Sequence, residues 1–346
     1  MRKRIFIHST WLLLGGCFLA LSLSACSSEA DAGDVEEGIA IATLEGQIGD
    51  ALPVTRTHIS NGEAGEGGDV NGSDLKTVFD VGDLIYASLS YEHDGQVHPY
   101  YYMGGNTFVS TNSPLIINKN ASPSQHLIAF YRGDLKRRLN HGLSFDVLQD
   151  QSTEYNHQAS EFIYGHAALT SSNVDVNTNF PELTFYHKTA RIILRIQCPS
   201  GTGYDVSKIS KVEIGNGVIY RRGTVKLDES TGDATINVLN AASSSVYSGT
   251  NSGYITAYRR IKSAPTSGAH SEMWASIVFP PQSIAATSNF FKVTYDGGDT
   301  GGHAAKTYYF HLLKDASFTD SNKKPFLENH AYYYAVTVGD HSAIQK

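Results

Sequence analysis

Charged residues are scarce in this chain of 346 residues: only 18% are Asp, Glu, Lys or Arg, and the formal net charge is −7. After residue 4, the only run of three basic residues is Lys136-Arg137-Arg138. Proteins that bind nucleic acids use a basic face to displace counterions from the phosphates. The composition therefore argues against a nucleic-acid partner.

Cysteine is rarer still, with Cys17, Cys26 and Cys198 as its three occurrences. The first two lie in the N-terminal 26 residues, which leaves one thiol for the rest of the chain. One thiol cannot form an internal disulfide, so the fold must be stabilised by its hydrophobic cores. Cys198 ends the apolar segment RIILRIQC, where we expect it to be buried as a small hydrophobic residue.

Motifs for catalysis and metal binding are missing. The fourteen histidines are scattered, with no His-x-x-x-His pair and no cysteine at ligand spacing. The chain also lacks the Gly-x-Ser-x-Gly elbow, the phosphate-binding loop and the dinucleotide-binding glycines. Asp80, Asp83 and Glu92 have no recognisable acid–base partner. We expect no enzymatic activity, no metal site and no cofactor, and we expect His187 to be a hydrogen-bonded polar residue at a strand end.

An export signal opens the chain. Residues 2–4 are basic, and residues 11–23 form an apolar core too short to span a bilayer. Residues 23–26, LSAC, resemble the lipobox of bacterial lipoproteins, in which the cysteine thiol receives a diacylglyceryl group before the chain is cut. The resemblance implies that residues 1–26 are a lipoprotein signal peptide and that Cys26 carries a lipid into the outer membrane. The alternative is a secretory signal with a chance cysteine.

The next segment is acidic. Residues 27–37, SSEADAGDVEE, hold four acidic side chains in their last seven positions and no apolar cluster. Such a segment cannot bury enough surface to fold, so we expect a solvated tether. Acidic residues close behind a lipidated cysteine also resemble the surface-export signal of lipoproteins in Bacteroides-like bacteria.

Short apolar runs with period two, bounded by Gly, Asn, Asp and Pro, dominate the rest of the chain. Strands at this spacing favour antiparallel β-sandwiches over parallel α/β units. A domain boundary is expected within residues 168–183, where small polar residues interrupt the pattern. Residues 122–132 fit a helix or a strand, and residues 324–333 predict a tight turn before the last strand. The pairs of runs that predict neighbouring strands are 83–93 with 96–103 around Asp94-Gly95, 211–215 with 217–222, 224–228 with 234–240, and 290–297 with 306–313.

Five segments resemble one known family in their order and spacing. They are VFDVGDLIYASL at 78–89, EFIYGHA at 161–167, ELTFYHKTARIILRI at 182–196, SIVFPPQSI at 276–284 and FLENHAYYYAVTV at 326–338. Together they resemble the fimbrillin family of Bacteroides-type lipoproteins, which are subunits of the type V pilus. The resemblance covers residues 78–338.

The resemblance implies an all-β fold of two tandem transthyretin-like antiparallel β-sandwich domains with Greek-key topology, here residues 57–175 and 176–346. It also implies a lipidated precursor, displayed on the cell surface and in the fimbrium, which a trypsin-like protease cuts after an arginine. The cut removes an N-terminal strand, and other pilus subunits then assemble by adding a donor strand to the open groove.

Residues 27–56 hold the candidates for this step. Residues 38–49, GIAIATLEGQIG, alternate apolar side chains and are the candidate removable strand. Arg56 is the only basic residue between Arg4 and Lys76, so we expect cleavage between Arg56 and Thr57. The alternative is that Arg56 is a linker residue and the strand stays, as in anchor-type subunits.

The position in the pilus and the ligand are further predictions. Only eight residues, GDHSAIQK, follow the last expected strand, whereas stalk subunits need a longer donor segment, so we expect a tip or accessory subunit. The rings of Tyr100, Tyr101 and Tyr102 form a candidate ligand-binding face for host or bacterial surface glycans or proteins. The alternative function is a glycan-binding surface lipoprotein that never polymerises.

Overall fold

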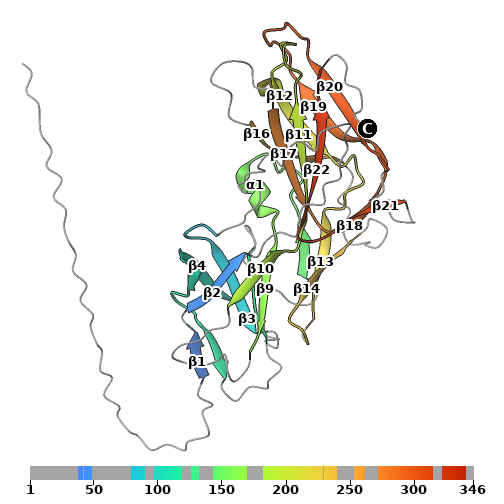
Figure 1. The fold of residues 1–346 in the computed structure, drawn as a ribbon. Coiled ribbons are helices and arrows are strands. Elements are labelled where there is room, and N and C mark those ends of the chain that lie inside the picture. The colour runs from blue at the N-terminus through green and yellow to red at the C-terminus, as the bar shows by residue number, and fades with distance from the viewer. Residues whose placement is uncertain are drawn as a thin grey trace, which may run out of the picture. The chain divides into compact units, whose positions relative to one another are not determined.

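The structure, a computed structural model, describes residues 38–41, 43–48, 79–89, 97–118, 126–131, 143–169, 182–228, 230–239, 253–261, 272–314 and 322–339 (Figure 1). These residues form strands almost throughout, with one short helix, α1 (Glu154–Ala159), and one 3-10 turn, η2 (Val206–Lys208). The all-β prediction is confirmed. No helix in this part of the chain is long and apolar enough to cross a membrane.

The first half of the fold is a closed barrel in which the strands follow the order β10-β2-β5-β4-β3-β7-β9, with β9 pairing back to β10. Antiparallel pairing of β3 with β4 agrees with the predicted hairpin, although its turn at Asp94-Gly95 lies outside the described residues. The barrel strands are β2 (Thr43–Ile48), β3 (Leu84–Leu89), β4 (His98–Gly104), β5 (Thr107–Val109), β7 (His126–Tyr131), β9 (Ile163–Ala168) and β10 (Leu183–His187).

Side chains of alternating residues fill the barrel, as the period of two in a strand requires. Leu44, Ile85, Tyr100, Leu127 and Phe185 are among those with no exposed surface, and they belong to one buried cluster. A sandwich was expected in this half. The structure instead has one sheet that curls until its first and last strands meet, so the core lies inside a single sheet.

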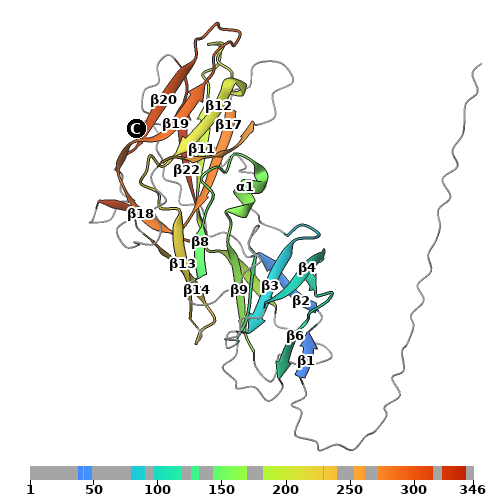
Figure 2. The same cartoon turned by 180° about the vertical axis from the view of Figure 1, so that it is seen from behind.

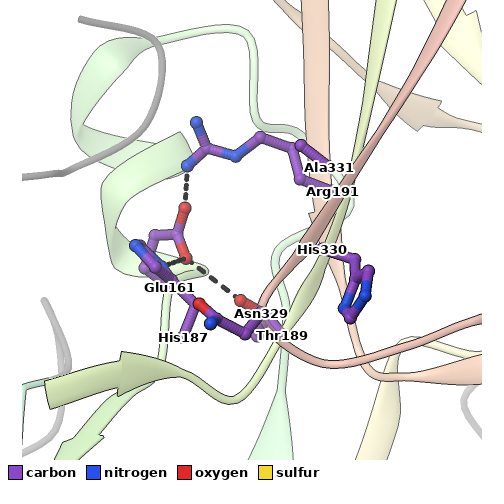
Figure 3. A pocket seen from close by; sticks show the side chains of 7 residues that line it. All are labelled: Glu161, His187, Thr189, Arg191, Asn329, His330 and Ala331. Atoms are coloured by element: carbon purple, nitrogen blue, oxygen red, sulfur yellow. Dashed lines mark hydrogen bonds and ion pairs between the residues drawn. The ribbon is translucent and has the colours of Figure 1, made fainter. Parts of the chain in front are cut away.

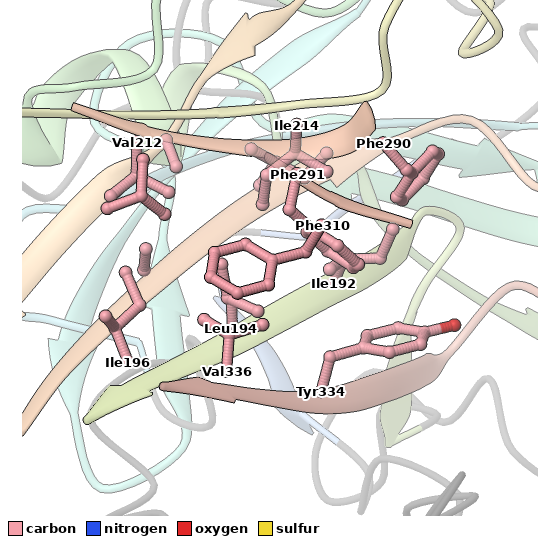
Figure 4. Packing of buried hydrophobic residues seen from close by; sticks show 14 of the residues in the cluster. Ile192, Leu194, Ile196, Val212, Ile214, Phe290, Phe291, Phe310, Tyr334 and Val336 are labelled. Atoms are coloured by element: carbon pink, nitrogen blue, oxygen red, sulfur yellow. The ribbon is translucent and has the colours of Figure 1, made fainter. Parts of the chain in front are cut away.

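The C-terminal half contains a sandwich of two four-stranded sheets, β16-β17-β11-β22 and β15-β12-β19-β20. The three residues Ile192, Leu194 and Ile196 of β11 point into the same buried cluster as Val212 of the facing sheet (Figure 4). A sandwich is thus present here, but β22 runs parallel to β11 rather than antiparallel. The strands are β11 (Ala190–Gln197), β12 (Ile209–Ile214), β15 (Ile255–Thr256), β16 (Tyr258–Ile261), β17 (Glu272–Phe279), β19 (Thr287–Tyr295), β20 (Lys306–Leu312) and β22 (His330–Thr337).

Cys198 follows β11 and belongs to this sandwich core, with 5% of its surface exposed. Burial raises the pKa of its thiol to about 12, so the thiol stays protonated and unreactive at neutral pH. The prediction that Cys198 is a buried small hydrophobic residue is confirmed.

A three-stranded sheet, β14-β13-β8, lies against the outside of the barrel. It consists of β8 (Leu143–Asp146), β13 (Arg222–Leu227) and β14 (Ala234–Val238). Phe145 and Val225 from this sheet share a buried cluster with Ile128, Phe130 and Tyr164 from the barrel strands β7 and β9. Strand β7 is therefore buried on both faces from Leu127 to Tyr131, which explains its nearly continuous apolar sequence.

The predicted boundary between residues 175 and 176 lies outside the described residues. On its N-terminal side, β8 pairs with β13, and on its C-terminal side, β10 pairs with β9 and β2. Strands on each side of the expected boundary therefore pair with strands on the other side. The division into 57–175 and 176–346 stays a prediction.

Two short strand pairs complete the described fold. β1 (Gly38–Ile41) pairs with β6 (Leu115–Asn118), and β18 (Gln282–Ala285) pairs with β21 (Lys323–Phe326). The tight turn predicted before the last strand is confirmed at Asn329, whose φ of 57° lies in the left-handed region that asparagine tolerates.

Candidate functional site: the strand that closes the barrel

Strand β2 completes the barrel by pairing with a different strand on each side (Figure 1, Figure 2). It runs antiparallel to β5, with Leu44 opposite Phe108, and parallel to β10, with Gly46 opposite Leu183. The Gly46 amide also donates a hydrogen bond to the Asn106 carbonyl at 2.8 Å. Without β2, the edges of β5 and β10 would both lose their hydrogen-bonding partner.

The side chains of β2 alternate between the core and solvent. Leu44 has no exposed surface and Gly46 is buried, whereas Glu45 and Gln47 are exposed and Ile48 is half-buried. Full burial of one leucine side chain stabilises a fold by about 1.5–3 kcal/mol. The strand is therefore held by main-chain hydrogen bonds, by the buried Leu44 and by the half-buried Ile48, which packs against the same core.

An aromatic cluster forms the floor under β2. The Phe79 ring lies 5.0 Å from the Phe108 ring and 5.2 Å from the Phe185 ring, both in edge-to-face geometry, and the Phe108 and Phe185 centroids are 6.0 Å apart. These three rings are buried beside Leu44 in the barrel core. Removing β2 would open an apolar slot with this floor and with two unpaired strand edges as its walls.

Strands β1 and β2 both lie within residues 38–49, the segment that the sequence predicts to be removable. One segment thus provides the partner of β6 and the strand that closes the barrel. Its removal would leave unpaired main-chain groups beside an apolar groove, which is what strand addition from another chain requires. Cys26, Arg56 and Thr57 lie outside the described residues, so lipidation and cleavage stay predictions.

The three tyrosines predicted as a ligand-binding face do not share one face. Tyr100 has no exposed surface, and its hydroxyl accepts a hydrogen bond from the Leu115 amide at 2.9 Å, so the prediction is corrected for this residue. Tyr101 is 39% exposed on the other side of the strand. Tyr102 is half-buried and packs against Phe79. Alternation along β4 places Tyr100 and Tyr102 on the barrel side and Tyr101 on the opposite side, so Tyr101 is the most exposed of the three.

A polar cluster that the sequence analysis missed lies where the chain passes from the barrel to the sandwich (Figure 3). The Glu161 carboxylate is 2% exposed and forms an ion pair with Arg191. It also accepts a hydrogen bond from the Thr189 hydroxyl at 3.0 Å and lies 3.1 Å from Nδ1 of His187. His187 is thus a hydrogen-bonded polar residue at the end of β10, as predicted.

Other polar side chains extend this junction. The Gln151 side chain exchanges two hydrogen bonds of 2.8 Å with the main chain of Val278 in β17. His157 of α1 lies 3.0 Å from the Ser276 hydroxyl. Burial, and then the charge of Arg191, hold the pKa of His157 well below its usual value. The Lys188 ammonium binds Asp233 at 2.8 Å and Glu328 at 3.2 Å.

The chemistry of this junction is structural. The pocket between Glu161 and His330 has room for about one water molecule, too little for a substrate. Glu161 lies against Arg191 and a hydroxyl donor, which fix the position of its carboxylate. Among the described residues, no group of three His, Cys, Asp or Glu side chains is arranged to hold a metal ion. One sequence signal pointed to the cluster: Arg191 is a charged residue near the start of the largely apolar strand β11.

Comparison with known families and structures places the chain in context. A family model described as fimbrillin-like matches residues 81–346. No curated protein matches the chain. The match begins after β2, so the strand that closes the barrel precedes the part of the chain that the family model covers.

Two solved structures from Bacteroides species share this fold. A candidate cell adhesion protein from Bacteroides uniformis superimposes with a TM-score of 0.51 at 16% identity, covering 87% of this chain and 93% of that protein. A second candidate cell adhesion protein, from Bacteroides ovatus, gives a TM-score of 0.50 at 15% identity, covering 88% of this chain and 94% of its own. At these identities the likeness shows a shared fold.

Proposed function

Because the chain belongs to the fimbrillin-like family, we propose that it is a structural and adhesive subunit of a bacterial surface fimbria, without enzymatic activity. It is exported as a precursor lipidated at Cys26 in the outer membrane. Cleavage between Arg56 and Thr57 releases the lipid together with the N-terminal strand, and a neighbouring subunit then supplies a strand to the open barrel. Two transthyretin-like domains, at residues 57–175 and 176–346, are part of the same proposal.

One observation carries this proposal: the segment expected to leave is the one that closes the barrel. Leu44 anchors β2 over an aromatic floor, and the strand pairs with β5 and β10 on its two sides. A sheet that has lost such a strand exposes two rows of unpaired main-chain groups and an apolar groove. Strand addition from another chain satisfies both at once.

The test is treatment of the full-length protein with a trypsin-like protease, followed by N-terminal sequencing and mass analysis. We expect a new N-terminus at Thr57 and loss of residues 38–48 from the folded product after gel filtration. The Arg56→Gln variant should keep its N-terminus, whereas Lys76→Gln should be cut like the parent. A blocked Thr57, with the strand still attached, would contradict the proposal and favour a tethered, non-polymerising lipoprotein.

A tip or accessory position in the fimbria is part of the same proposal. Immunogold labelling of fimbriae from cells that produce this protein separates the possibilities. Label at one end of each fibre supports the tip position, and label along its whole length assigns the protein to the stalk. Label confined to the cell surface identifies an anchor.

A further inference from the structure

Gly46 in β2 has a neighbour that leaves no room for a side chain. A Cβ atom at this position would lie 2.8 Å from Cε2 of Phe185 and 2.9 Å from the carbonyl oxygen of Leu183. Real Cβ atoms essentially never approach other heavy atoms this closely. The φ angle of Gly46 is not in the left-handed region, so glycine is needed here for space and not for backbone conformation.

The obstructing ring is held in place. Phe185 has no exposed surface and packs edge-to-face on Phe79. On its other side it lies against a second glycine, Gly165 of β9, where an added Cβ would be 2.9 Å from the Thr184 carbonyl and 3.1 Å from Cδ1 of Phe185. The ring thus lies over one glycine in each of the two strands beside β10.

The two glycines differ in what happens to them. Gly165 belongs to β9, which stays in the barrel, whereas Gly46 leaves with β2 if the N-terminal strand is removed. Phe79 and the residues of β9 that contact Phe185 follow the expected cleavage site and stay in the barrel. An incoming strand in the same register must therefore pass the ring at the position opposite Leu183.

We propose that this slot selects its partner by glycine: it accepts an extended segment of another polypeptide with the pattern apolar–x–Gly–x–apolar. The first apolar side chain takes the place of Leu44 over Phe108, and the glycine takes the place of Gly46 over Phe185. The x positions correspond to the exposed Glu45 and Gln47 and accept any side chain. This selection rests on the proposed strand replacement.

A peptide-replacement experiment tests the rule. Full-length protein is cut with a trypsin-like protease in the presence of fluorescent peptides of residues 38–49, and incorporation is followed by anisotropy and native mass spectrometry. The parent peptide and a Glu45→Ala peptide should be incorporated equally. A Gly46→Ala peptide should bind about tenfold more weakly, because its extra methyl group would overpack a core that is already filled. Equal binding of the Gly46→Ala and parent peptides overturns the proposal.

A double-mutant cycle in the uncut chain provides the second readout. Gly46→Ala should lower the midpoint of urea unfolding, Glu45→Ala should leave it unchanged, and the loss from Gly46→Ala should shrink in a Phe185→Leu background. Absence of coupling between positions 46 and 185 overturns the steric rule. If the cut chain releases its own strand but incorporates no peptide, strand replacement itself fails, whereas the cycle still decides whether Phe185 imposes glycine.

Discussion

The barrel and the sandwich are completed in different ways. Every strand of the two four-stranded sheets lies between Ala190 and Thr337, in one continuous stretch of the chain. The barrel instead takes β2, at residues 43–48, to fill the space between β5 and β10. A cut in the chain between β2 and β3 would detach one strand of the barrel and no strand of the sandwich. Under the proposed cleavage, the barrel would be the exchangeable unit and the sandwich the permanent one.

Breaking the junction between the two regions should have the largest effect. Glu161→Gln leaves the buried Arg191 without its counter-charge, and the loss of one partner of a buried ion pair typically costs about 3–5 kcal/mol. We expect this loss of stability in urea unfolding, with the barrel and the sandwich separating into two transitions. Lys211→Gln is the control, because the Lys211 side chain is 48% exposed and Glu213 keeps Lys292 as a partner; it should cost less than about 1 kcal/mol. Equal losses of stability in the two variants would show that the buried Glu161–Arg191 ion pair stabilises the fold no more than the Lys211–Glu213 pair does.

A matched pair of cavity variants tests which unit is exchangeable. Leu44 and Leu194 have no exposed surface, and each substitution by alanine should cost about 2–5 kcal/mol in the uncut protein. After cleavage and removal of the N-terminal fragment, the cost of Leu44→Ala should vanish because its strand is gone, while the cost of Leu194→Ala should persist. Urea unfolding before and after protease treatment measures both. A Leu44→Ala effect that survives cleavage would mean that β2 stays bound.

The smallest expected effect is a pH dependence that arises at the junction. His157 is neutral in the folded state because burial and Arg191 keep its pKa well below the usual value. The unfolded chain binds a proton at this residue below about pH 6.5, so the free energy of unfolding should fall as the pH drops, by up to about 1.4 kcal/mol per pH unit. His157→Gln, which can still bind Ser276, should flatten the curve between pH 6.5 and 5. An unchanged slope would assign the dependence to other groups.

Local strand pairs could be predicted from the sequence, because a hairpin needs only its own residues. The predicted pairs at 224–228 with 234–240 and at 290–297 with 306–313 correspond to β13 with β14 and to β19 with β20. The pair expected around Asn216 is absent: β12 pairs with β15 and β19, and the chain after Gly217 leads into β13 of another sheet. The turn residues were present, but packing against distant strands decided the partner.

The rest of the fold depends on contacts that no local pattern encodes. Helix α1 spans only six residues, capped by the Thr153 hydroxyl, which is too short for helical periodicity to appear. The pairings of β2 with β10 and of β11 with β22 are parallel and join residues more than one hundred positions apart. The alternation of Leu44, Gly46 and Ile48 predicted a strand, but only the position of Phe185 explains why the middle residue is glycine.

The direction of β2 has a consequence for any assembly built on its slot. The strand runs parallel to β10 and antiparallel to β5, so its two neighbours point in opposite directions and a reversed strand would match neither pairing. A replacement strand that restores these pairings enters in one orientation, and the donor always lies toward the same end of the acceptor. Each contact of this kind is head-to-tail and repeats without closing a two-fold pair. A fibre made from such contacts has two chemically different ends and can grow at one while it is anchored at the other.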